Sequence, residues 1–216
     1  MSNLIKYVFF DVANTLLHKP LLFTTIQNCL LDFNYKIDLE KIKYNHKFLC
    51  EIYDFPDKTS EAFYNNFNAD LVLLLGIEPK EELIKHIFFS CKNMPWETFE
   101  DVGILNEISQ NLGIISNWDS SLEHKLQNYF GDIFKIKFVS EVEKVRKPNL
   151  SFYKKIIKTT GLKPNEILYV GDSLKLDYIP STLLGINSLI IDRDNIFKQF
   201  CPHTIGHLNE IKKHLA

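Results

Sequence analysis

The sequence predicts an α/β fold whose core is a parallel, Rossmann-like sheet, because two patterns alternate along the chain. Short runs of β-branched and aromatic residues, bounded by turn residues, are typical of buried strands. They lie at Ile5–Phe10, Gly113–Ile115, Ile136–Val139, Ile167–Val170 and Ser188–Ile191. Segments with helical spacing of apolar residues separate the later runs. Strands that alternate with helices form a parallel sheet that is covered on both faces.

The segments between the later strands carry the helical pattern. They are Val102–Asn111, Ser120–Phe130, Leu150–Thr160 and Leu174–Leu184. Gly113, Gly161 and Gly185 stand where C-terminal caps are expected. We therefore predict a helix in each of these segments.

A long interval between the first two strands contains helical periodicity and no convincing strand. It runs from about Pro20 to Pro95 and is too long for an ordinary crossover. Turn-forming residues divide it into predicted helices at Leu21–Phe33, Leu39–Tyr53, Ser60–Leu75 and Lys80–Cys91. We predict an α/β core of residues 1–19 and 96–216, and a helical insert of residues 20–95 over the sheet.

The composition limits the partners of the protein. A formal net charge of -2 provides no basic stripe, so nucleic acid is not an expected partner. The apolar runs are too short for a signal peptide or a membrane span. The four cysteines form no CxxC pair and are interpreted as reduced thiols of a cytoplasmic protein. A monomer is expected, or a homodimer if the apolar insert offers a surface.

Polar residues gather where the predicted strands end, which is where open parallel sheets bind ligands. Asp11 to Thr15 follow the first strand, Ser116-Asn117 the second, and Gly171-Asp172-Ser173 the fourth, with Asp177 beyond. Lys147-Pro148 precedes a predicted helix. Most of these features have an ordinary structural explanation when taken singly. Their order and placement together favour a catalytic site.

These residue types suit phosphoryl transfer, which needs a nucleophile, a metal, a fixed cation and neutral hydrogen-bond donors around one phosphorus. Asp11 can serve as nucleophile and metal ligand, and Asp172 as a second oxygen ligand for Mg²⁺. Lys147 supplies the cation, and Ser116 with Asn117 the donors. Asp177 can hold water on the metal or orient Lys147.

Four segments resemble the motifs of the haloacid dehalogenase (HAD) superfamily of hydrolases. FFDVANTLL resembles motif I, IISNWDSSL motif II, KVRKPNLSFYKKI motif III, and ILYVGDSLKLDYIPSTLLGINSLII motif IV. The resemblance implies an aspartyl-phosphate on Asp11 and a small, anionic, phosphorylated substrate. It also implies Mg²⁺ held by Asp11, the Ala13 carbonyl and Asp172, with Thr15, Ser173 and Asp177 in support. The helical insert corresponds in position to the family's cap.

One position departs from the phosphatase pattern D-x-D-x-T, in which the second aspartate protonates the leaving group and then activates water. Ala13 stands there and has no proton to give, although general acid–base catalysis contributes about 10²–10⁴-fold. His18 is one candidate for a relocated donor. Alternatives are cleavage of a carbon–halogen or carbon–phosphorus bond, and a catalytically feeble protein that binds phosphate for regulation.

Three weaker features are weighed against ordinary structural roles. Carbon–phosphorus cleavage would need an imine-forming lysine from the insert, for which Lys41, Lys43, Lys47 and Lys58 are available. Trp96, Phe99 and Trp118 could stack on a substrate, but large aromatic residues more often pack in a core or a hinge. Cys201, His203 and His207 lack the fourth ligand of a zinc site and are interpreted as a surface loop.

Overall fold

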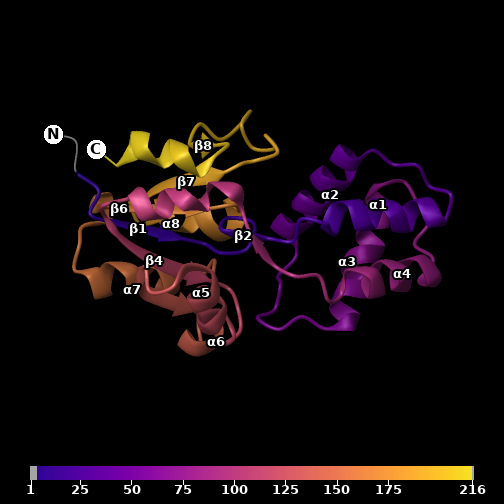
Figure 1. Cartoon of the computed structure of the whole chain (residues 1–216), viewed down its shortest axis with the longest axis horizontal. Helices are drawn as coiled ribbons and strands as arrows, with labels where there is room; N and C mark the ends of the chain where they lie inside the picture. Colours follow the sequence, from indigo (N-terminus) through magenta and orange to yellow (C-terminus); the bar gives the residue numbers. More distant parts are fainter. Residues whose placement is uncertain (1–3, 216) are drawn as a thin grey trace. The chain divides into compact units, whose positions relative to one another are not determined.

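In the computed structural model, which describes residues 4–215, the chain divides into two units (Figure 1). One unit combines Met1–His18 with Thr98–Ala216, and the other is Lys19–Glu97. The segment predicted as an insert, residues 20–95, falls inside the second unit. The short strands β2 (Leu17–His18) and β3 (Glu97–Thr98) pair at the points where the chain leaves and re-enters the first unit.

Among the described residues, the first unit contains a six-stranded parallel sheet in the order β5-β4-β1-β6-β7-β8. Its strands are β1 (Tyr7–Phe10), β4 (Asn111–Ser116), β5 (Phe134–Val139), β6 (Ile167–Gly171), β7 (Asn187–Ile191) and β8 (Thr204–Ile205). The α/β class and the five predicted strands are confirmed. The two-residue strand β8 is too short to leave a pattern in the sequence.

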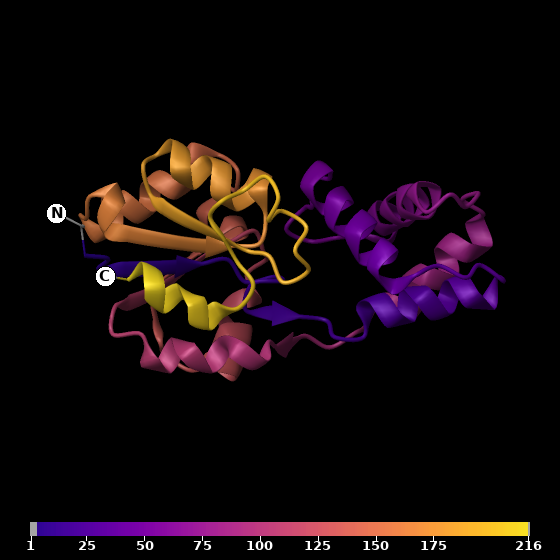
Figure 2. The same cartoon turned by 90° about the horizontal axis from the view of Figure 1, so that it is seen from above.

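Helical segments cover both faces of this sheet. They are the 3₁₀ segment η1 (Glu100–Glu107), α5 (Leu122–Phe130), α6 (Ser140–Glu143), α7 (Leu150–Thr160), the 3₁₀ turn η2 (Pro164–Glu166), the π turn η3 (Leu174–Tyr178), α8 (Ile179–Leu183) and the 3₁₀ segment η4 (Leu208–His214). Figure 2 shows η1 and η4 on one side of the sheet, with α7 and α8 on the other. The strands are consequently buried, and Val8, Phe9 and Phe10 have no exposed surface.

Two predicted helices differ from the observed elements. The segment predicted as a helix over Val102–Asn111 is a 3₁₀ segment that ends at Glu107, and Asn111 already begins β4. The segment Leu174–Leu184 is one π turn followed by the short helix α8. Pro180 explains the break, because it lacks an amide hydrogen and is favoured in the first turn of a new helix.

Gly113 was predicted as a helix cap, and this is wrong because the residue lies inside β4. A Cβ atom at this position would overlap the ring of Phe9 on the neighbouring strand β1. Glycine therefore makes room for a buried aromatic ring. Gly161 and Gly185 do follow helices, with φ angles of +65° and +78°, as their predicted capping role requires.

The second unit is a bundle of four helices within the described residues. They are α1 (Leu22–Asp32), α2 (Leu39–Ile52), α3 (Glu61–Leu74) and α4 (Glu81–Cys91), each close to its predicted range. α1 packs against α2 and α4, and α3 packs against the same two helices. No helix in the described part of the chain is both long and apolar enough to cross a membrane.

His46 lies in the second unit, and we expect its protonation to make the stability of the protein depend on pH. Its ring meets the rings of Phe23 and Phe67 at centroid distances of 5.2 and 5.0 Å, and Nδ1 lies 3.6 Å from Cys50 Sγ. Burial, with a smaller contribution from Lys47, lowers the pKa of His46 to about 4. An unfolded histidine titrates near 6.5, so between about pH 6.5 and 4 the unfolded chain binds more protons. Stability is therefore lost as the pH falls through this window.

We expect the free energy of unfolding to fall by about 1–2 kcal/mol more in the wild type than in His46→Gln between pH 7.5 and 5. Urea denaturation at the two pH values measures this difference. Because each protein is compared with itself, any effect of the substitution that does not depend on pH cancels. An equal pH dependence in both proteins would show that another group is responsible.

Candidate active site

Asp11 lies immediately after β1, and its two carboxylate oxygens differ in their surroundings. The backbone N–H of Asp11 donates to the Val170 carbonyl at 2.9 Å, which continues the pairing of β1 with β6. The side chain is buried, and its Oδ1 accepts from Ser116 Oγ at 3.0 Å and from Lys147 Nζ at 2.6 Å. Among the described residues no donor contacts Oδ2. One oxygen is thus fixed, and the other is available to a ligand.

Lys147 places a buried cation beside Asp11. Its Nζ lies 2.6 Å from Asp11 Oδ1, 2.6 Å from Asp177 Oδ1 and 3.4 Å from the Tyr169 hydroxyl. Burial alone would lower the pKa of the ammonium, but the two carboxylates outweigh it and raise the pKa above its usual range. Asn117 holds the backbone here: its Oδ1 accepts from the Lys147 N–H at 2.8 Å, and its Nδ2 donates to the Lys147 carbonyl at 3.0 Å.

Asp177 lies in the π turn η3 and is almost completely buried. Its Oδ1 accepts from Lys147 and, at 2.7 Å, from the Tyr169 hydroxyl, while Oδ2 accepts from the Ser173 N–H at 3.0 Å. A Cβ atom at Gly171 would overlap this carboxylate, so only glycine lets it approach β6. Both oxygens of Asp177 are therefore engaged by the protein.

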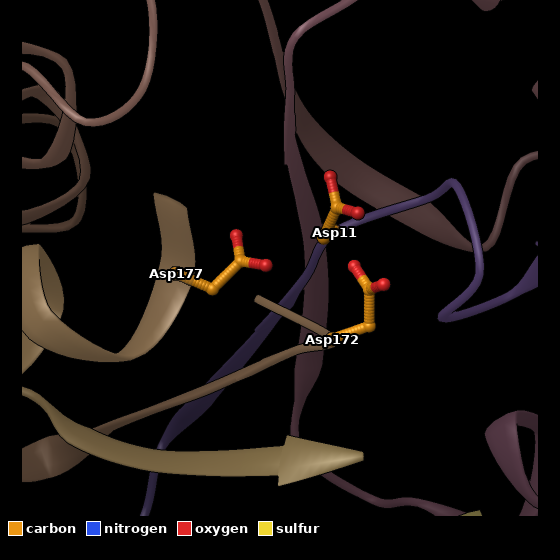
Figure 3. A group of neighbouring side chains, drawn as sticks. All are labelled: Asp11, Asp172 and Asp177. Carbon is orange, nitrogen blue, oxygen red and sulfur yellow. The ribbon is translucent and has the colours of Figure 1, made fainter. Parts of the chain in front are cut away.

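Asp172 completes a group of three carboxylates, drawn in Figure 3. One oxygen from each of Asp11, Asp172 and Asp177 lies within 4.8 Å of the others. Burial raises the pKa of Asp11 to about 7; Asp177 and Asp172 add to this rise, and Lys147 opposes it. Since one ammonium faces three carboxylates, the site has a deficit of positive charge. All-oxygen ligands with excess negative charge fit a hard divalent cation such as Mg²⁺.

The loop after Asp11 is held by Arg193, whose ion pair with Asp101 the sequence did not reveal. Arg193 Nη2 donates to the Thr15 carbonyl at 3.2 Å, and both terminal nitrogens of Arg193 bind Asp101, at 2.6 and 2.9 Å. Thr15 is fully buried, and its Oγ1 has no hydrogen-bond partner among the described residues. Arg193 follows β7, so its position after a strand was the signal that could have found it.

The proposed proton donor His18 stacks on Phe99, with ring centroids 4.0 Å apart. Phe99 also contacts Arg193, whose guanidinium carbon lies 3.8 Å from the ring centroid. Phe99 thus has a packing role within the first unit. Lys19 Nζ lies 5.4 Å from the ring centroid of Trp96. The backbone N–H of Trp118 donates to Ser140 Oγ.

The other weak candidates have partners elsewhere. His203 Nδ1 lies 2.6 Å from the Tyr178 hydroxyl, and His207 Nδ1 accepts from the Asn209 N–H. The only group of three or more possible metal-binding side chains in residues 4–215 is Asp11, Asp172 and Asp177. Lys41, Lys43 and Lys47 contact oxygens of their own unit, namely the Leu75 carbonyl, Glu40 and Glu51.

The structure thus brings most of the predicted site residues to one edge of the sheet. Ser116 and Lys147 each contact Asp11, and Lys147 also contacts Asp177. Asn117 supports Lys147 through its side chain, and Ser173 Oγ accepts from the Leu176 N–H to begin the π turn. Ala13 forms an isolated bridge with Leu17 in the loop after β1.

Comparison with known proteins identifies the family. A sequence model described as haloacid dehalogenase-like hydrolase matches residues 5–180, which is most of the chain. The chain belongs to the haloacid dehalogenase-like hydrolases. The predicted family and the predicted class of enzyme are therefore confirmed.

Two curated relatives match about half of this chain. The haloacid dehalogenase-like hydrolase domain-containing protein 3 of Danio rerio is 28% identical over 109 residues, covering 48% of this chain and 45% of that protein. A glyceraldehyde 3-phosphate phosphatase of Methanocaldococcus jannaschii is 28% identical over 117 residues, covering 50% of each chain. The chain spans about half the length of the curated relatives it matches.

Solved structures share the fold over nearly the whole chain. The HAD-hydrolase YfnB of Bacillus subtilis, bound to magnesium, covers 98% of both chains with a TM-score of 0.65 and 19% identity. A 2-haloacid dehalogenase of Pseudomonas syringae also covers 98% of both, with a TM-score of 0.57 and 15% identity. Because neighbours with different reactions share this fold, the fold does not select the bond that is cleaved.

Proposed function

We propose that this protein is a magnesium-dependent phosphatase that acts on a small phosphorylated metabolite through an aspartyl-phosphate on Asp11. The proposal rests on the different surroundings of the two Asp11 carboxylate oxygens. Ser116 and Lys147 fix Oδ1, while Oδ2 has no donor among the described residues and is the oxygen suited to attack phosphorus. Attack forms the Oδ2–P bond as the bond from phosphorus to the leaving oxygen breaks. Water then cleaves the acyl phosphate and regenerates Asp11.

Asp11, Asp172 and the Ala13 carbonyl would hold Mg²⁺, which neutralises phosphoryl oxygen charge when it is bound. Asp177 is a poor direct ligand because Lys147, Tyr169 and Ser173 already occupy its oxygens. We assign Asp177 the role of holding Lys147 in place. The buried carboxylate of Asp11 and the partly buried carboxylate of Asp172 support this choice of cation by their chemistry and by the excess of negative charge.

Lys147 and Ser116 would bind the phosphoryl group once it is on Asp11, and their contacts with the carboxylate that would carry it support this role. Their donors would stabilise negative charge in a buried site, where such interactions are strong. Asn117 contributes by fixing the backbone of Lys147, and Thr15 and Ser173 support the two loops. A small anionic substrate agrees with the relatives named as phosphatases of glyceraldehyde 3-phosphate.

Rapid mixing with p-nitrophenyl phosphate and Mg²⁺ tests this function. We expect a burst of p-nitrophenolate equal to the enzyme concentration and then slow turnover, because Ala13 cannot activate the hydrolytic water. Acid-quenched samples should contain a phosphate group on the peptide that includes Asp11. Absence of both the burst and the phosphopeptide would rule out the covalent mechanism and favour cleavage of another bond or a binding role.

Metal binding can be tested apart from turnover. Mg²⁺ with orthovanadate, each at about 100-fold above its Kd, should raise the Tm by roughly 5–10 °C, because a ligand bound only by the folded protein stabilises it. Asp172→Asn should lose this shift, and Asp132→Asn, which changes an exposed aspartate outside the cluster, should keep it. An unchanged wild-type Tm would contradict a metal-assisted anion site.

A further inference from the structure

We infer that Tyr169 is a positioning residue for Lys147, acting through Asp177. Its hydroxyl lies 2.7 Å from Asp177 Oδ1, the same oxygen that accepts from Lys147 Nζ at 2.6 Å. The phenol and the ammonium therefore fix one carboxylate oxygen between them. The kinetic consequence of this inference rests on the proposed phosphatase function, whereas its structural consequence does not.

The numbers of donors and acceptors on Tyr169, Asp177 and Lys147 determine which group donates in each contact. A tyrosine hydroxyl has one proton to donate. The Asp177 carboxylate at 2.7 Å is a better acceptor than the Ile115 carbonyl at 3.4 Å, so the proton points at Asp177. The hydroxyl oxygen can then accept from Lys147 Nζ at 3.4 Å. With Asp11 and Asp177, this gives each of the three ammonium protons an acceptor.

Burial makes this arrangement rigid. Tyr169, Asp177 and Lys147 are at most 3% exposed, so water does not compete for their contacts. Tyr153 from α7 packs edge-on against the Tyr169 ring, at 5.5 Å and 72°, and its hydroxyl bonds to the Leu176 carbonyl in the π turn. Burial first, and then the charge of Asp177, raise the pKa of Tyr169 well above its ordinary range, so the phenol remains a donor.

The position of Tyr169 in the sheet connects it to the nucleophile as well. It pairs with Phe9 across β1 and β6, and the next residue, Val170, accepts the Asp11 N–H. The strand that carries the phenol thus also holds the backbone of the nucleophile. Loss of the hydroxyl should leave this backbone in place and loosen only Asp177 and Lys147.

Tyr169→Phe removes the hydroxyl and keeps the ring. We expect kcat for p-nitrophenyl phosphate to fall about tenfold with KM nearly unchanged, because a hydrogen bond to a charged group is lost where transition-state charge develops. Tyr7→Phe is the matched control: Tyr7 is also a buried tyrosine of a central strand, and its hydroxyl has no partner among the described residues. Its kcat should stay within about twofold of the wild type.

A double-mutant cycle tests the route through Asp177. In an Asp177→Asn background, Tyr169→Phe should cost less than about twofold, since the carboxylate on which it acts is gone. The same tenfold loss in both backgrounds would overturn the inference. So would equal losses in Tyr169→Phe and Tyr7→Phe, which would indicate a general effect of removing a core hydroxyl.

The ammonium signal of Lys147 gives a readout that does not require activity. A buried, hydrogen-bonded lysine exchanges its Nζ protons slowly enough for ¹⁵N–¹H spectroscopy, and Lys147→Met identifies the signal by its loss. We expect Tyr169→Phe to shift or broaden this signal and Tyr7→Phe to leave it unchanged. An unaltered Lys147 signal in Tyr169→Phe would overturn the inference even if the protein proves inactive as a phosphatase. If Tyr169→Phe does not fold, Asp177→Asn tests the same link, and an unaltered signal there has the same meaning.

Discussion

Replacing Asp11 by asparagine should lower kcat for p-nitrophenyl phosphate by about 10³-fold or more, because the substitution removes the attacking oxygen of a covalent mechanism. Asparagine has nearly the same shape, and its remaining oxygen can still accept from Ser116 and Lys147. The Oδ2 position then carries an amide nitrogen, which is not a nucleophile. Steady-state release of p-nitrophenolate and acid-quenched phosphopeptide both measure the loss.

The fold should survive this substitution. The site holds three carboxylates against one ammonium, and burial, with the charges of Asp177 and Asp172, raises the pKa of Asp11 to about 7, so a neutral side chain there avoids burying a charge and relieves repulsion. The Tm without Mg²⁺ should therefore be equal to that of the wild type or higher. Asp132→Asn makes the same chemical change at an exposed position and should retain full activity. Turnover by Asp11→Asn close to the wild-type rate would mean that another group attacks the substrate.

Much of this candidate site could be predicted because the carboxyl ends of adjacent parallel strands lie side by side at one edge of the sheet. Asp11, Ser116 and Asp172 each stand at the end of a strand, and β4, β1 and β6 are adjacent in the sheet. Side chains that are about 105 positions apart in sequence therefore meet at one edge, as the Ser116–Asp11 contact shows. The residue types at those strand ends were sufficient to suggest phosphoryl transfer.

Residues whose role depends on a neighbour across the fold could not be found in this way. Tyr169 lies inside an apolar strand, where an aromatic residue normally belongs to the hydrophobic core. Only the contact with Asp177 indicates a role for its hydroxyl. Gly113 was read as a cap because local sequence does not reveal the Phe9 ring beside it. Arg193 and Asp101 lie 92 positions apart, and neither belongs to a short motif.

Ala13→Asp should raise the rate for alkyl phosphates by about 10²-fold, since a positioned general acid or base contributes about 10²–10⁴-fold. Ala13 lies two positions after the nucleophile in a loop held by its bridge with Leu17 and is partly exposed, so the new carboxyl has room beside the site. Its proton would go to the leaving oxygen, and its carboxylate would then take a proton from the attacking water. Ala13→Asn has a similar size without an ionisable group and should remain slow.

The choice of substrate separates the two steps in which this acid would act. p-Nitrophenolate leaves readily without a proton, so Ala13→Asp should increase its burst rate little and should mainly accelerate the slow phase. Glycerol 2-phosphate has an alkoxide leaving group, so its first step should accelerate as well, and the gain should be larger. If Ala13→Asp speeds neither substrate while the Asp11 phosphopeptide still forms, then the wild type already has another proton donor, and His18, stacked on Phe99, becomes the next residue to replace. A gain confined to the slow phase would instead show that hydrolysis of the aspartyl-phosphate limits the natural protein.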